Sequence, residues 1–123
     1  MTEGRRRIAD ERGAVTAELA LGLPLVLAVT VGLVWLLAVA SAQIRVVDAA
    51  REAARSIARG DDESSARSLA LRIAPDGALL DVAIEGGQVA VTSKAEVDGP
   101  GGLFDFMPGV TISSRAVAVM EGP

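Results

Sequence analysis

The chain has 123 residues, which is enough for one small domain and an appended segment, and half of its residues are hydrophobic. Its formal net charge of −4 argues against nucleic-acid binding, which requires a basic surface. The sequence contains no histidine and no cysteine, which removes the commonest general acid–base group, thiolate chemistry and disulfides, and so disfavours an enzyme.

A polar leader occupies residues 1–13 and carries four arginines against three acidic residues. Residues 14–123 carry eight basic and thirteen acidic side chains, so basic charge is concentrated at the N-terminus. Such a leader suits a segment held on the cytoplasmic side of a membrane. Arginine counting does not fix the orientation by itself, because four more arginines follow the apolar run, at Arg45, Arg51, Arg55 and Arg59.

The next segment is a run of 26 residues, Leu19 to Ile44, without a charged side chain. A helix needs about 20 apolar residues to cross a hydrocarbon layer of about 30 Å. We therefore predict a transmembrane segment at about residues 19–42. The run is too long for a signal peptide, although residues 38–42 (AVASA) resemble a signal-peptidase site and leave cleavage there as a minor alternative. Trp35 lies within the run and is interpreted as a helix–helix packing residue.

The predicted helix continues beyond the membrane segment, so that residues 14–59 form one long helix that ends before Gly60. Pro24 cannot donate a hydrogen bond to the Ala20 carbonyl group, so we expect a kink in the apolar half. The second half is amphipathic, because its apolar residues recur at three- and four-residue steps. The residues of this predicted buried face are Ile44, Val47, Ala50, Ala54 and Ile57.

A second, short helix is predicted at residues 64–74, with Asp61, Asp62, Ser64 or Ser65 as its cap. Ala66, Leu69 and Ile73 share one face of this helix and are expected to be buried. A Pro-Asp-Gly sequence follows and marks the end of the helix with turn chemistry.

Beyond this helix the apolar residues alternate with a period of two, which is typical of strands. We predict strands in LLDVAIE (residues 79–85) and QVAVTSKAEV (residues 88–97), joined by a Gly-Gly turn, and a last strand in VTISSRAVAV (residues 110–119). A three-stranded antiparallel sheet packed on the long helix gives an α+β fold. The glycine-rich loop before the last strand holds Phe104 and Phe106, which are expected to close one end of the core.

Other candidate sites are weak. The acidic run at residues 61–63 fits helix capping better than calcium binding, because no EF-hand spacing follows it. The serines have no histidine with which to form a hydrolytic triad. The glycine-rich residues 99–102 lack the ending of a phosphate-binding loop. The sequence therefore predicts no catalytic residue, metal ion or cofactor.

The segment RGAVTAELALGLPLVL, at residues 12–27, resembles the N-terminal signature of type IV pilin-like proteins, and most closely the TadE-like family of minor pilins, or pseudopilins. The resemblance implies that a prepilin peptidase cuts between Gly13 and Ala14. Glycine suits such a cut because it has no side chain to obstruct an extended backbone in the protease. Pro24 matches a proline that is common early in TadE-like helices.

Glu18 corresponds to the glutamate that pilin-like proteins carry at the fifth position after the cut. An unpaired carboxylate near the hydrocarbon is costly. The α-amine exposed at Ala14 would lie about one helical turn away, in the same or a neighbouring subunit, and would neutralise the charge and set the register of one helix against the next. The alternative is an interfacial acid favoured by the helix dipole. Leu19 stands where small major pilins of this class have tyrosine, which favours a minor pilin.

The resemblance therefore predicts a non-enzymatic structural subunit, assembled as a minor component of a Tad-type IV pilus or a related secretion filament. Its implied partners are a prepilin peptidase, other pilin subunits, the Tad-type assembly machinery and the membrane. Residues 60–123 are expected to form a domain outside the cytoplasm. The alternative is an uncleaved single-pass membrane protein with a small extracytoplasmic binding domain.

Overall fold

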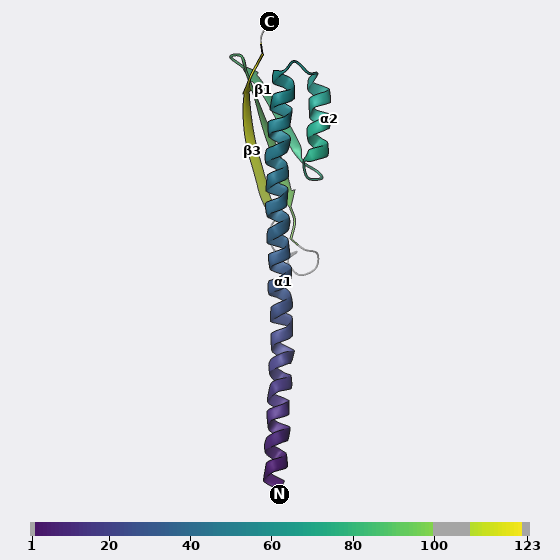
Figure 1. The fold of residues 1–123 in the computed structure, drawn as a ribbon, viewed down its shortest axis with the longest axis vertical. Coiled ribbons are helices and arrows are strands. Elements are labelled where there is room, and N and C mark those ends of the chain that lie inside the picture. The colour runs from purple at the N-terminus through teal and green to yellow at the C-terminus, as the bar shows by residue number, and fades with distance from the viewer. Residues whose placement is uncertain (1, 100–108, 122–123) are drawn as a thin grey trace. The chain divides into compact units, whose positions relative to one another are not determined.

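The computed structural model describes residues 2–99 and 109–121 and confirms an α+β architecture with two helices and a three-stranded antiparallel sheet (Figure 1). The chain divides into two structural units at the Val34–Trp35 bond. The elements, in chain order, are α1 (Thr2–Ala58), α2 (Glu63–Ile73), β1 (Leu79–Glu85), β2 (Gln88–Val97) and β3 (Val110–Val119).

Helix α1 begins at Thr2, so it includes the leader as well as the apolar run. The leader contains four arginines and two glutamates, residue types that favour helix, and its glycines do not interrupt the helix. At the other end, the amide of Gly60 donates to the Ile57 carbonyl oxygen and the amide of Asp61 donates to that of Ser56, both at 3.0 Å. Gly60 has a φ of 99°, so this is a Schellman ending, as a glycine at this position predicts.

Helix α2 is joined to its neighbours by arginine side chains. Arg67 donates from Nη1 to the Leu80 carbonyl oxygen of β1 at 2.9 Å. The predicted buried face is only partly right, because Ala66 is buried and Ile73 is half-buried, whereas Leu69 is 39% exposed. Ala70 takes the central buried position instead. Small side chains at these positions allow close packing of the helix on the core.

The sheet has the order β1-β2-β3, with both pairs antiparallel. Gly86 and Gly87 have φ values of 58° and 76°, which are those of the type I′ turn that a Gly-Gly hairpin predicts. The register is continuous, with Val91 opposite Val82 on β1 and opposite Ala116 on β3. One face of β2 is therefore buried over its length, at Val89, Val91, Ser93 and Ala95.

This buried face of the sheet packs with the second half of α1 and with α2 in one hydrophobic cluster (Figure 1). The predicted face of α1 is correct for Ala50, Ala54 and Ile57, but Ile44 is 62% exposed and Val47 is half-buried. The buried face of α1 is rotated around the helix from its predicted position. The reason is that mostly alanines, and not the larger Ile44 and Val47, face the core. The buried residues of α1 are Ala42, Val46, Ala49, Ala50, Ala53, Ala54, Ser56, Ile57 and Ala58. Phe104 and Phe106 lie outside the described residues.

Candidate functional site

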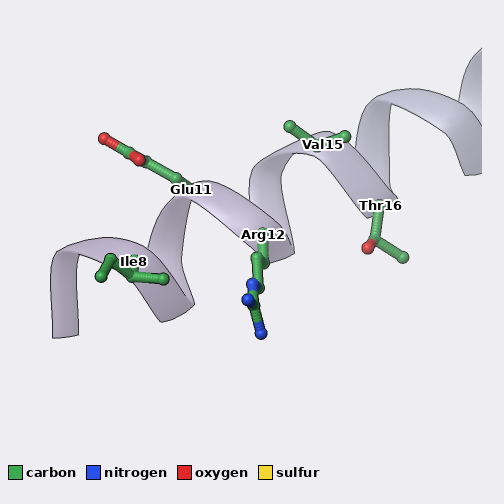
Figure 2. Close-up of a pocket in the computed structure, with 5 residues that line it drawn as sticks. All are labelled: Ile8, Glu11, Arg12, Val15 and Thr16. Carbon is green, nitrogen blue, oxygen red and sulfur yellow. The ribbon is translucent and has the colours of Figure 1, made fainter. Parts of the chain in front are cut away.

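The residues of the predicted cleavage site lie on α1, in the first structural unit, and all of them are exposed. A shallow hollow flanks the predicted cut and is lined by residues on both sides of it (Figure 2). Figure 2 shows the side chains of Ile8, Glu11, Arg12, Val15 and Thr16 along this part of the helix. The side chains around the predicted cut therefore all lie on α1 and are exposed.

The fold of the chain does not itself require glycine at position 13. No heavy atom lies within 4 Å of the place where a Cβ would stand on Gly13, and its φ is not positive. A glycine inside a helix costs about 0.5–1 kcal/mol relative to alanine. Gly13 therefore weakens α1 at the predicted cut without serving the packing of the chain. The residues around Gly13 are helical, and glycine lowers the cost of extending the backbone at this position.

Glu18 follows one turn later and is exposed on the same helix. Two ion pairs are found within the described residues, Arg59 with Asp61 and Arg67 with Glu63, and Glu18 takes part in neither. The residues one turn away along α1 are uncharged, with Ala14 before Glu18 and Gly22 after it. Glu18 therefore has no cationic side chain one turn away on its own helix.

The apolar half of α1 is long and apolar enough to cross a membrane, and none of its most apolar stretch is buried in the structure. Most leucine and valine side chains in this stretch are more than half exposed, for example Leu21 at 78%, whereas Val31 is half-buried. The helix continues through Pro24 without a break in secondary structure. Thr30 returns a hydrogen bond from Oγ1 to the Val26 carbonyl oxygen at 2.8 Å, so its hydroxyl group is satisfied within the helix.

Two interactions of the second unit were not apparent from the sequence. The indole Nε1 of Trp35 donates to the Asp98 carbonyl oxygen at 3.0 Å, so Trp35 contacts its own domain instead of serving only another helix. Arg45 donates to the carbonyl oxygens of Ile73 and Ala74. Both contacts join residues far apart in sequence, and the residue types alone do not predict which residues they contact.

The acidic run before α2 has structural partners. Asp61 pairs with Arg59 at 3.0 Å, and Glu63 pairs with Arg67 at 3.1 Å. Asp62 precedes the helix, and its carbonyl oxygen accepts the amide of Ala66 at 2.9 Å, although its side chain makes no cap. Within the described ranges, no cluster of three or more acidic side chains is arranged to hold a metal ion.

The geometry is thus an exposed apolar helix headed by a dispensable glycine and an unpaired glutamate. Comparison with known protein families tests whether this combination of features is the signature of a family or a chance pattern. Residues 13–55 match the family model of TadE-like proteins. The resemblance predicted from the sequence is confirmed. The TadE-like segment, residues 13–55, begins at Gly13 and ends in the buried half of α1.

The TadE-like family comprises structural membrane proteins that are associated with Tad pili, and it is not a family of enzymes. Among curated proteins, the chain is 42% identical over 81 residues to the apoptosis inhibitor Rv3655c of Mycobacterium tuberculosis. This similarity covers 66% of the chain and 58% of the relative, so the chain spans little more than half the length of the curated relative that it matches. No solved structure matches the chain.

Proposed function

We propose that the protein is a minor pilin of a Tad-type IV pilus or a related secretion filament, made as a precursor and cut after Gly13. The observation that carries this proposal is the exposed apolar half of α1, which begins directly after Gly13 and Glu18 within the TadE-like segment. None of its most apolar stretch is buried in the structure, so this stretch requires lipid or other helices.

Cleavage would change the charge at the head of the helix. It would remove a leader with four arginines and three acidic residues and leave an α-amine on Ala14, about one turn before Glu18. In the precursor this carboxylate lacks a cationic neighbour on its own helix within one turn. The new amine, in the same or an adjacent subunit, would supply it. Processing would thereby prepare the helix for assembly.

Assembly would use the side of α1 that faces away from the domain. Leu37, Ala40 and Ile44 follow one another at steps of three and four residues and therefore lie on one side of the helix. All three are exposed, with Leu37 at 71% and Ile44 at 62%, whereas Ala42 and Val46 between and beyond them are buried in the domain. This exposed stripe fits the α1 helix of a neighbouring pilin subunit.

The decisive experiment is the intact mass of the protein produced with a prepilin peptidase of a Tad system. We expect loss of residues 1–13 from the native chain and retention of these residues in Gly13→Ile. The matched control is Gly4→Ile, which places the same side chain at the other leader glycine and should still be cut. A native chain that keeps its leader in the presence of active peptidase would refute the proposed processing.

The second candidate is an uncleaved single-pass protein whose domain binds a partner. A hollow on the sheet favours it, because small alanine side chains (Ala83 and Ala90) and charged ones (Glu85 and Arg115) line it together. The name of the mycobacterial relative describes an apoptosis inhibitor, and an inhibitory activity of this chain would belong to this candidate. Retention of the leader together with membrane insertion would support it.

A further inference from the structure

The apolar run of α1 is shared between two environments. From Trp35 onward, one side of the helix belongs to the folded domain: Trp35 is half-buried and bonded to Asp98, Val39 packs against the core, and Ala42 is buried. These residues recur at three- and four-residue steps, so they form one stripe. The part of the run that precedes the second structural unit, here called the free part, therefore ends at Val34, and Val31 and Gly32 within it are half-buried.

The free part is too short to cross a bilayer. Leu19 to Val34 comprises 16 residues. At a rise of about 1.5 Å per residue they extend about 24 Å, which is about 6 Å less than the hydrocarbon thickness of about 30 Å. Tilting the helix shortens its projection and enlarges this deficit. Taking in residues from one end of the run or from the other would close this deficit.

At the domain end, deeper insertion meets two carboxylates. Glu96 and Asp98 are both exposed. Their oxygens lie 2.7 Å and 2.8 Å from the place of a Cβ on Gly109, so both acids lie at the same end of the sheet. Since Trp35 is bonded to the Asp98 carbonyl group, drawing Trp35 into the hydrocarbon would bring these acids with it. Each charge within the bilayer costs several kcal/mol.

At the other end, only one carboxylate stands in the way. Adding residues 15–18 to the free part brings it to 20 residues, about 30 Å, and includes Glu18. Side chains of a helix point toward its N-terminus, so the Glu18 carboxylate can reach back toward the aqueous boundary. One charge near the surface costs less than two charges carried inward with a folded domain.

We propose that Trp35 lies at the outer lipid–water boundary and that the end of the domain formed by Trp35, residues 96–99 and Gly109 rests on the lipid headgroups. The membrane span is then residues 15–34. Tryptophan prefers this boundary in membrane proteins. Its indole N–H is held by the Asp98 carbonyl oxygen at 3.0 Å, so the side chain fixes the depth of the domain as well as its own. This inference rests on the membrane anchoring in the proposed function.

Trp35 is the one tryptophan of the chain, so its fluorescence reports its depth without labelling. We suggest reconstituting the full chain in phosphatidylcholine vesicles that contain lipids brominated near the glycerol end or near the methyl end of the acyl chains. We expect strong quenching by the shallow bromines and loss of most of that quenching with the deep bromines. Equal or stronger quenching by the deep bromines would overturn the proposal, and so would the absence of quenching by both.

Two variants in a Trp35→Phe background calibrate the measurement. Leu27→Trp places the indole in the middle of the span and should be quenched most by the deep bromines. Leu79→Trp places it on β1, at a side chain that is 73% exposed, and should be quenched by neither. If Leu27→Trp is not quenched at all, the helix is not inserted and the proposed anchoring fails. If it is quenched and Trp35 behaves in the same way, only the inferred boundary fails.

The inner boundary has its own test, because the chain has no cysteine and single cysteines can be introduced. In the uncut precursor, produced without a prepilin peptidase and inserted into open membrane sheets, we expect Ala17→Cys to react far more slowly than Ile8→Cys with a maleimide that does not enter lipid. Equal rates would show that Glu18 stays in water and would overturn the assignment of residues 15–18 to the span.

Discussion

The guanidinium group of Arg45, on α1, donates from Nε to the Ile73 carbonyl oxygen at 3.0 Å and from Nη2 to the Ala74 carbonyl oxygen at 3.1 Å. These carbonyl groups stand at the C-terminal end of α2, where a helix leaves its last acceptors without intrahelical donors. A cation at this end also interacts favourably with the helix dipole. Arg45 therefore closes α2 and ties it to α1 at once.

Arg45→Ala should destabilise the domain, because it removes these donors from two carbonyl groups, and the hydrogen bond to that of Ala74 is partly buried. The expected loss in the free energy of unfolding is about 1–3 kcal/mol. Chemical denaturation followed by circular dichroism in detergent micelles would measure it. Arg51→Ala, an exposed arginine on the same helix, is the matched control and should change stability by less than about 0.5 kcal/mol. An equal effect of both variants would deny Arg45 its capping role.

We expect the substitution Ser93→Ala to increase the free energy of unfolding of the domain. Its side chain is fully buried in the middle of β2, and its Oγ has no hydrogen-bond partner within the part of the chain that the structure describes. Ser93→Ala removes this unsatisfied group and should stabilise the domain by about 1 kcal/mol. Ser56→Ala is the comparison, because the buried Ser56 hydroxyl donates to Glu52 Oε1 at 3.3 Å and accepts from Arg59.

The Ser56 variant should lose about 1 kcal/mol, so the two serine-to-alanine changes are expected to have opposite signs. Thermal unfolding of both variants under one set of conditions would show this. A destabilised Ser93→Ala would mean that the hydroxyl group has a partner in solution.

Ile44→Lys tests the exposed stripe of α1. The side chain is 62% exposed, so the substitution should leave the fold intact. Burying an isoleucine side chain contributes about 1.5–3 kcal/mol, so its loss from a subunit interface should lower incorporation about tenfold or more. Quantitative immunoblotting of sheared filaments would measure this. Leu79→Lys, at another exposed apolar position, should incorporate normally, and equal losses in both variants would point to a general effect of charge.

Glu18→Ala should leave peptidase cleavage largely intact and impair assembly, because it removes the carboxylate that would pair with the Ala14 amine. Glu18→Asp keeps the charge on a shorter side chain and should recover part of the incorporation. Intact mass reports cleavage, and the subunit content of filaments reports assembly. Normal incorporation of Glu18→Ala would remove the proposed role of Glu18 in setting the register between helices.

The prediction from sequence succeeded where local patterns suffice. The two glycines between alternating segments fixed the hairpin between β1 and β2, because a type I′ turn needs positive φ at both central positions. Gly60 marked the end of α1 for a similar reason. The buried stripe of α1 was less predictable, because alanine occurs all around the second half of the helix. The prediction therefore assigned Ile44 to the buried face, although Ile44 is exposed. Val46, which is larger than the surrounding alanines, is buried in the core instead.

The features of the candidate site likewise fall into those that the sequence predicts and those that depend on the tertiary structure. The sequence by itself determined the charge-free run, the glycine and glutamate that precede it, and the family match over residues 13–55, because each depends on residues adjacent along the chain. Only the tertiary structure decided how much of that run remains free for a membrane. That length depends on Trp35 meeting Asp98, 63 residues later, and on Ala42 entering the core. Hydropathy is a property of each residue, whereas exposure is set by whichever distant segment packs against it.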